Sequence, residues 1–342
     1  MNNDYVVIVD TIDASKAEER YQSVLDAVTR TKLIVINVEV TSLCNLNCDY
    51  CGMHGKANAI NAKSKTTMSY SKLKEIVDKC IGMPIMSTFY FGGHGEPLLN
   101  KDLVLMVSYV KKHKIAEKIA ITTNGILLSS DLFQSLCTAG VDEVRVSYDI
   151  FSPDIYKKSK GSSSSLTVRK NIEDCVKVLN SNSITNLTIE CKNWVAGSSE
   201  RNNETECIID YFRHYKDITD KFKIRIIDEF EWNMNKTNNI NRIERTTACE
   251  QPFYMIQIHA DGDVSCCCLD VSKELIIGNV NSVDKINHIL GHDRMVNIRK
   301  KLLNQDYANL SICHSCNKYS CIDSLLVERK HEILKCLINT SP

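Results

Sequence analysis

The chain has 342 residues, of which 43% are hydrophobic and 25% charged, so it is long enough for a main globular domain and a smaller one. Lysine plus arginine and aspartate plus glutamate balance at 42 each, which gives no reason to expect nucleic acid or an anionic membrane as a partner. Its 16 cysteines occur without a basic-then-apolar leader and without an apolar run of about eighteen residues. We therefore expect a reducing, cytoplasmic setting, in which these cysteines are thiols or metal ligands.

Residues 1–32 are expected to form a short extension ahead of the main fold. An apolar run, Tyr5–Val9, is followed by a helical pattern from Ser15 to Arg30. From residue 33 onward, stretches typical of strands and helices alternate. Strands are expected near 33–41, 87–92, 118–123, 142–148, 184–192 and 222–229, and helices near 68–80, 101–114, 130–139, 165–180 and 203–216. This alternation predicts a parallel α/β sheet, either doubly wound or curved into a barrel.

Polar and apolar residues alternate within several of these strands. A parallel sheet covered on both faces would instead show continuous aliphatic runs. We therefore expect one face to line a polar lumen, the alternative being a solvated sheet edge. Ligands of α/β barrels lie at the carboxyl ends of the strands, so polar residues there are candidates for the rim of a site. These candidates are Thr41, Ser147, Asp149, Glu190 and Lys192.

Three cysteines with the spacing C-x3-C-x2-C follow the first of these strands directly. They are Cys44, Cys48 and Cys51, and Tyr50 precedes the last of them. A zinc site usually takes four protein ligands, whereas three thiolates in one loop leave one iron of a cubane cluster open. The spacing favours an iron-sulfur cluster with a reactive iron, with a zinc loop or three unrelated buried cysteines as the alternatives.

Two turns at the ends of later strands are further candidates. The second strand runs into Gly93-His94-Gly95-Glu96, where glycines let backbone approach a ligand beside a carboxylate, although Glu96 could simply begin a helix. The third ends in Thr122-Thr123-Asn124-Gly125, a turn with hydroxyls and an amide at the strand end. Ser159–Ser165 is serine-rich and is expected to be a flexible loop with a possible lid role.

A second cysteine pattern begins at Cys249, after an expected linker at 231–248. Asp261–Asp263 predicts a hairpin turn ahead of Cys267, and a late C-x2-C pair supplies Cys313 and Cys316. Four thiolates suit either a [4Fe-4S] cluster or a structural zinc ion. A slip of one residue would put Cys266 or Cys268 in place of Cys267.

These motifs together resemble the radical S-adenosylmethionine (SAM) enzymes that carry a C-terminal SPASM or Twitch domain. The resemblance implies a partial (β/α)6 TIM-like barrel at 33–230 and a small cysteine-rich domain at 249–342 with a C-terminal helix. It implies that the first three cysteines hold a [4Fe-4S] cluster whose open iron binds SAM, and that Cys249, Cys267, Cys313 and Cys316 hold an auxiliary [4Fe-4S] cluster. The implied SAM contacts are Tyr50, Gly93, Gly95, Glu96, Thr122, Asn124 and Ser147.

The positions of Cys321 and Cys336 depart from the pattern of relatives with two auxiliary clusters. One auxiliary cluster is therefore expected, with a second left open. Together with the short amino-terminal segment, this favours an analogy to Twitch-type dehydrogenases.

On that analogy the radical formed by reductive cleavage of SAM abstracts hydrogen from a small polar metabolite, such as an amino-sugar or cyclitol. Glu190 or Asp149 is the candidate catalytic base, and a flavodoxin or ferredoxin is the expected electron donor. One alternative is a peptide- or protein-modifying maturase that forms a thioether, an epimer or an oxidised side chain. Another is a non-catalytic iron-sulfur or zinc protein that senses redox state.

Overall fold

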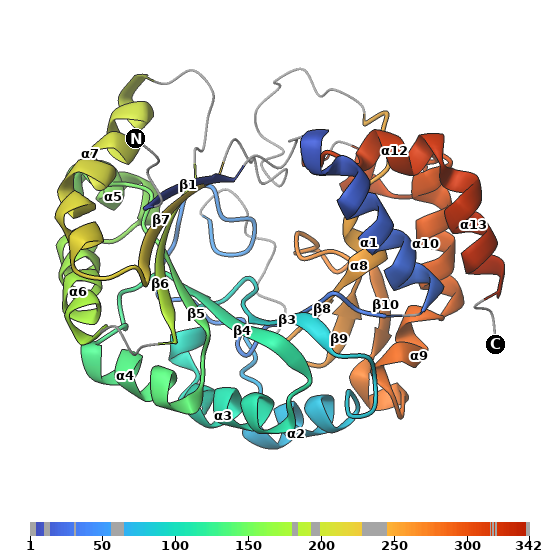
Figure 1. Ribbon diagram of the computed structural model, residues 1–342, viewed down its shortest axis with the longest axis horizontal. Helices are drawn as coiled ribbons and strands as arrows, with labels where there is room; N and C mark the ends of the chain where they lie inside the picture. The colour runs from blue at the N-terminus through green and yellow to red at the C-terminus, as the bar shows by residue number, and fades with distance from the viewer. Residues whose placement is uncertain are drawn as a thin grey trace.

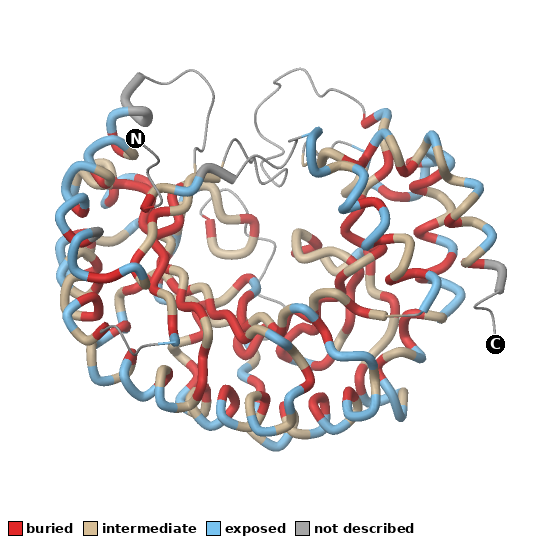
Figure 2. Tube along the Cα trace, in the orientation of Figure 1, coloured by how far each residue is buried: buried red, intermediate tan, exposed pale blue. Residues whose placement is uncertain are grey.

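The computed structural model describes residues 5–9, 14–30, 32–55, 65–179, 184–192, 199–227, 245–314, 316, 318 and 320–339. In this part of the chain a ten-stranded sheet has the order β1-β7-β6-β5-β4-β3-β2-β8-β9-β10. The sheet curves into an open C shape, with helices on its outer side (Figure 1). Buried residues concentrate between the strands and these helices (Figure 2).

Six parallel strands form the partial barrel that was predicted. They are β2 (Val35–Val38), β3 (Met86–Phe91), β4 (Ala116–Thr123), β5 (Glu143–Ser147), β6 (Asn186–Lys192) and β7 (Phe222–Ile227). The helices between them are α2 (Tyr70–Asp78), α3 (Leu103–His113), α4 (Ser130–Ala139), α5 (Pro153–Lys160), α6 (Ser165–Val178) and α7 (Ser199–Phe212). All six expected strands and the five expected helices are present, most of them with shifted ends, whereas α5 was not predicted.

The alternation of the strands separates two environments. Ile36 and Val38 of β2 and Val144 of β5 are fully buried in the aliphatic core under the helices. Side chains of intervening residues such as Tyr90 and Arg145 meet one another on the concave face, where the guanidinium lies 5.5 Å from the ring centroid. The predicted polar lumen is therefore present, and its floor is built by consecutive strands.

The amino-terminal segment contributes to both ends of the sheet. β1 (Val6–Val9) pairs in parallel with β7 at one edge. α1 (Ala17–Thr29) instead packs against α13 (Lys330–Asn339) and α8 (Gln251–Tyr254) near the other edge (Figure 1). Tyr21 of α1 is fully buried there. These residues are thus integral to the fold, and the division of the chain at residue 32 stays a prediction.

The carboxyl-terminal part extends the barrel sheet. β8 (Met255–Ile258) pairs in parallel with β2, and β9 (Asp263–Ser265) and β10 (Ile276–Asn279) continue it in antiparallel fashion. The predicted hairpin turn joins β8 to β9, with Gly262 at φ 91°, a left-handed conformation that favours glycine. The helices that follow are α9 (Ile286–Leu290), α10 (Asp293–Leu303), α11 (Ser311–His314) and α12 (Asp323–Glu328). The predicted linker at 231–248 lies outside the described residues as far as 244.

The prediction of a flexible loop at Ser159–Ser165 is wrong. Ser159 and Lys160 are the last residues of α5, and Ser165 begins α6. Gly161 ends α5 with φ 70°, and the carbonyl of Ser159 accepts a hydrogen bond from the Asp49 amide at 2.8 Å. The serine-rich stretch is therefore a short turn between helices that is tied to the cysteine loop.

Among the described residues, no helix combines the length and apolar character needed to cross a membrane.

Candidate functional site

The loop that carries Cys44, Cys48 and Cys51 follows β2 at the carboxyl edge of the barrel. Two backbone amides point at its sulfurs: Leu46 N lies 3.4 Å from Cys44 Sγ, and His54 N lies 3.3 Å from Cys51 Sγ. Burial, reinforced by Glu96 and the two other thiols, raises the pKa of Cys44 to about 12. A buried thiol with so high a pKa becomes a thiolate when a metal replaces its proton, and amide donors to sulfur tune iron-sulfur clusters. The loop fits a three-cysteine cluster.

A buried lysine holds this loop from the side of α5. Lys160 Nζ lies 2.7 Å from Asp149 Oδ1, with both side chains at most 3% exposed, and it also contacts the Tyr50 hydroxyl. Although burial opposes the charged form, Asp149 and Tyr50 raise the pKa of Lys160 well above its usual range. The positive charge in turn opposes the effect of burial, which raises the pKa of Cys48. The two predicted site residues Tyr50 and Asp149 thus meet at a lysine that sequence reasoning had assigned to a loop.

The glycine turn after β3 lies against the end of β2. A Cβ atom on Gly95 would lie 2.0 Å from the Thr41 carbonyl oxygen and 2.7 Å from that of Leu43, so only glycine fits there. On Gly93, where φ is 150°, it would lie 2.8 Å from Glu39 Cβ. The Glu96 amide then donates to the Leu43 carbonyl at 2.7 Å, which joins the turn to the cysteine loop.

Glu96 is buried, and its carboxylate organises the neighbouring turn. Thr123 Oγ1 donates to Oε1 at 2.7 Å, and the Asn124 amide donates to Oε2 at 2.7 Å. Burial raises the pKa of Glu96 despite these donors. Asn124 also donates through Nδ2 to Asn45 of the cysteine loop at 2.7 Å. The two turns and the cysteine loop thus form one connected edge, in which Thr123, missed from the sequence, bonds to the carboxylate directly.

The lumen below this edge is polar and charged. The Tyr90 hydroxyl contacts Thr122 Oγ1, and the Arg145 guanidinium lies over the Tyr90 ring. Burial opposes ionisation of Glu143, yet Arg145 and Lys118 lower the pKa of Glu143 to about 2. These charged side chains form fixed pairs on the lumen floor.

Glu190 lies higher on the same face, beside Ser147 in the register of β5 and β6. Its carboxylate is 3.4 Å from Lys192 Nζ and 3.5 Å from Arg225 Nη1. Both distances are long for hydrogen bonds between charged groups. Glu190 therefore lies near two cations but forms a short ion pair with neither Lys192 nor Arg225. The structure therefore brings Ser147 and Glu190 together and leaves Asp149 with Lys160.

The predicted auxiliary cysteines come from three segments of the carboxyl-terminal part, at Cys249, Cys267 and the Cys313–Cys316 pair. Burial and the nearby Cys268 and Cys249 thiols raise the pKa of Cys267 well above its usual range, and burial, Cys249 and Cys316 act in the same direction on the pKa of Cys313. Four partly buried thiols fit the donor set of a cubane cluster, and the same set suits zinc.

Nearby residues bear on which cysteines belong to that set. Cys266 is fully buried in the apolar core, whereas Cys268 is half-buried. Cys336 Sγ instead contacts Thr29 Oγ1 of α1 at 3.2 Å. Arg245 secures the loop, with Nη1 3.4 Å from the Cys316 carbonyl oxygen and Nη2 2.5 Å from Asp323 Oδ2.

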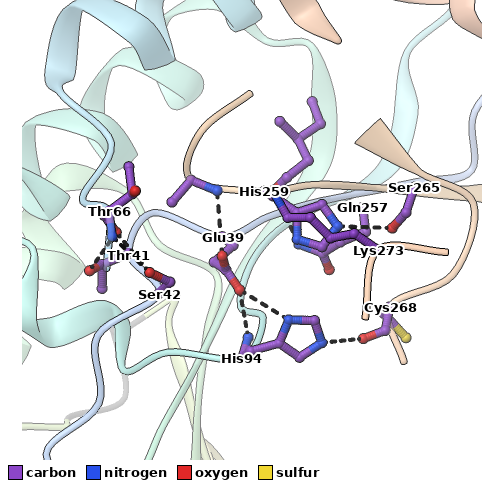
Figure 3. Close-up of polar contacts among 12 residues, drawn as sticks. Glu39, Thr41, Ser42, Thr66, His94, Gln257, His259, Ser265, Cys268 and Lys273 are labelled. Atoms are coloured by element: carbon purple, nitrogen blue, oxygen red, sulfur yellow. Dashed lines mark hydrogen bonds and ion pairs between the residues drawn. The ribbon is translucent and has the colours of Figure 1, made fainter. Parts of the chain in front are cut away.

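A buried Glu39, His94 and His259 cluster joins the barrel to the auxiliary region (Figure 3). Glu39 Oε2 accepts from the His94 amide at 2.9 Å and lies 3.3 Å from His94 Nδ1. Burial opposes ionisation of Glu39, but the backbone amide and the adjacent imidazole of His94 lower the pKa of Glu39 to about 2. Burial lowers the pKa of His259 to about 4, which keeps that ring neutral at ordinary pH. Sequence analysis missed this cluster, although polar Gln257 and His259 alternate with isoleucines as in β2.

Comparisons with known proteins agree with this geometry. A model of the radical SAM superfamily matches residues 38–190, and a model of the SPASM iron-sulfur cluster-binding domain matches residues 249–317. The fold and the two cysteine sites thus define a barrel protein that binds iron-sulfur clusters. The chain therefore contains a radical SAM domain followed by a SPASM iron-sulfur cluster-binding domain.

A probable GTP 3',8-cyclase of Methanococcus maripaludis is 36% identical over 141 residues, which are 41% of this chain and 45% of that protein. The chain therefore aligns with less than half the length of this relative. Among solved structures, BtrN in complex with AdoMet and 2-DOIA is similar with a TM-score of 0.56 at 20% identity, covering 85% of this chain and 95% of that one. Native anSMEcpe with bound AdoMet and Kp18Cys peptide has a TM-score of 0.57 at 16% identity, covering 89% and 98%. At these identities the likeness concerns the fold alone.

The two domains imply SAM and [4Fe-4S] clusters as cofactors, including an auxiliary cluster in the SPASM domain. The donor sets described above fit both kinds of cluster, and the predicted cofactors and family are confirmed. The assignment of each ligand and each SAM contact remains a prediction.

Proposed function

We propose that this protein is a radical SAM oxidoreductase that dehydrogenates a small polar metabolite, such as an amino-sugar or cyclitol, in the barrel lumen. The observation that carries the proposal is the position of Glu190, a buried carboxylate on the rim with Ser147 beside it and two cations 3.4 and 3.5 Å away. Such a surface suits hydroxyl and amino groups better than an apolar side chain.

When bound, SAM and the three-cysteine cluster supply a 5′-deoxyadenosyl radical, and the auxiliary cluster supplies an electron acceptor. Oxidation of a carbinol to a carbonyl removes one hydrogen atom from carbon, one proton from oxygen and one electron. The protein must therefore provide a group that takes the hydroxyl proton.

Glu190 fits that task better than Asp149. The Asp149 side chain is 1% exposed and already pairs with the buried Lys160 at 2.7 Å. Glu190 has more distant partners, Lys192 at 3.4 Å and Arg225 at 3.5 Å, and in this proposal these two cations bind the polar substrate beside it. We assign Glu190 as the base and Asp149 as a positioning residue for the cysteine loop.

The placement of the cysteines supports a single auxiliary cluster, because Cys336 contacts α1 rather than the other thiols named above. A flavodoxin or ferredoxin in a reducing cytoplasm is the proposed electron donor. The main alternative is a peptide-modifying maturase, since proteins that share this fold include one solved with a peptide. The identity to a relative named as a cyclase adds a third possible reaction on the same barrel.

The first test compares SAM cleavage with product formation. Reconstituted protein given dithionite, SAM and a set of amino-sugars and cyclitols should release 5′-deoxyadenosine together with a product two mass units lighter than the substrate. Glu190→Gln should still cleave SAM but lose most of the product, because the amide cannot take the proton. An exposed control, Glu206→Gln on α7, should behave like the wild type. Full product formation by Glu190→Gln would remove this residue as the base.

A further inference from the structure

In the Glu39, His94 and His259 cluster, hydrogen bonds to neighbouring groups determine which ring nitrogen of each histidine carries a proton. His94 Nε2 lies 3.1 Å from the Cys268 carbonyl oxygen. A carbonyl oxygen only accepts, so Nε2 must carry a proton. In a neutral ring Nδ1 then presents a lone pair to Glu39 Oε2, 3.3 Å away, which also only accepts. This contact is favourable only when a cation lies between the two atoms.

His259 also carries its proton on Nε2, for a different reason. Its Nε2 lies 3.1 Å from Ser265 Oγ, and that hydroxyl donates its only hydrogen to the Cys267 carbonyl oxygen at 3.0 Å. The hydroxyl must therefore accept from Nε2–H, which leaves Nδ1 of the neutral ring as a lone pair. An outer hydrogen bond of this kind is what orients a metal-binding imidazole in proteins.

The donor atoms of the three residues lie within 4.8 Å of one another. Metal–nitrogen and metal–oxygen bonds of about 2.0–2.1 Å in a tetrahedral site place neighbouring donors about 3.4 Å apart, close to the observed Glu39–His94 separation. A proton could bridge that pair but not the third donor as well. A metal ion would use all three.

We propose that Glu39, His94 and His259 bind a mononuclear divalent transition metal, with zinc as the ion that two imidazoles and a carboxylate favour. The site is separate from both cysteine sites and does not depend on the proposed substrate. Its ligands come from the end of β2, from the glycine turn after β3 and from the end of β8 (Figure 3).

His54 of the cysteine loop is the candidate for a fourth ligand. Its Nε2 atom is buried and has no hydrogen-bond partner among the described residues. A metal here would link the SAM-cluster loop, the glycine turn and the auxiliary loop at one point. Its role would be structural, because it would fix the positions of these segments between the two cysteine sites.

The test measures zinc beside cluster iron. Anaerobically reconstituted protein is treated with EDTA, incubated with zinc, desalted and analysed by mass spectrometry for iron and zinc. We expect about one zinc per chain in addition to the iron of the clusters. His259→Gln and His94→Gln should each lose most of this zinc while keeping the wild-type iron content. His113→Gln, on α3, is the matched control and should keep both metals.

A second measurement guards against misfolded variants. Zinc X-ray absorption of the wild type should show nitrogen and oxygen neighbours near 2.0 Å, without the sulfur neighbours near 2.3 Å that zinc in a cysteine site would give. A wild-type protein that takes up no zinc, zinc retained by both histidine variants, or a sulfur coordination shell would overturn the proposal. Absence of zinc uptake by the wild type would identify His94 and Glu39 as an ion pair of an imidazolium and a carboxylate.

Discussion

At the scale of single residues, the Lys160–Asp149 pair yields a clear stability prediction. Both side chains are almost completely buried. Lys160→Met leaves the Asp149 carboxylate without this cation, and breaking a buried pair typically costs roughly 3–5 kcal/mol. We expect a lower thermal midpoint and incomplete iron loading at the three-cysteine site. Lys158→Met, exposed on the same helix, is the control.

A double variant separates charge from packing in this prediction. Lys160→Met combined with Asp149→Asn removes both charges and should recover much of the lost stability, because neither partner remains as an uncompensated buried ion. If Lys160→Met unfolds at the same temperature as the Lys158→Met control, the pair does not stabilise the loop.

Site residues could be predicted from the sequence where their motif lies within a few neighbouring positions. The cysteine loop and the glycine turn could be recognised because spacing and glycine content are properties of adjacent residues. Lys160 contacts a loop about 110 positions away, and nothing in its serine-rich surroundings indicates that contact. Likewise Glu39 and His94 were both visible, but their pairing with His259 depends on β8 lying beside β2.

At the scale of elements, the glycine turn after β3 gives the next prediction. In Gly95→Ala the added Cβ would overlap the Thr41 carbonyl oxygen at 2.0 Å, so the turn must move and the Glu96–Leu43 hydrogen bond must weaken. We expect SAM affinity to fall about tenfold or more, or about 1.4 kcal/mol, by calorimetry on reconstituted protein. In Gly278→Ala the new atom would meet nothing closer than 3.7 Å. That control should bind SAM normally, and equal affinity in both variants would show that the turn tolerates the shift.

Helices and strands with a strong hydrophobic periodicity were predicted well. Elements whose formation depends on tertiary contacts were predicted poorly. The alternating strands of the barrel gave both their positions and the face that lines the lumen. α5 was missed because its sequence, Pro153–Lys160, is short and polar, and its one buried hydrophobic residue is Tyr156. β1 was visible only as an apolar run, since pairing with β7 requires the whole barrel to be in place.

At the scale of the whole molecule, the sheet passes without a break from the barrel into the SPASM region through the β2–β8 pairing. The two cysteine sites nevertheless use ligands from separate segments. Reconstituted protein should hold about eight irons, and changing Cys44, Cys48 and Cys51 together to alanine should leave about four. Iron and sulfide analysis with electron paramagnetic resonance measures this. An unchanged iron content in the triple variant would refute the assignment of these cysteines.

The reverse variant tests how the two halves cooperate. Cys313→Ala with Cys316→Ala removes two thiols of the auxiliary set but leaves the loop after β2 intact, because the cysteine loop is held by Lys160, Ser159 and the Leu43–Glu96 bond rather than by α11. Reductive cleavage of SAM should therefore continue, while the electron released by a substrate radical has no nearby acceptor. We expect 5′-deoxyadenosine without the corresponding oxidised product, measured as a ratio by mass spectrometry. An iron content of about four per chain, the number expected for the three-cysteine cluster alone, is the control for correct folding of this variant. Normal product formation by the folded variant would show that substrate oxidation does not use the auxiliary site, and would favour the cyclase alternative over a dehydrogenase.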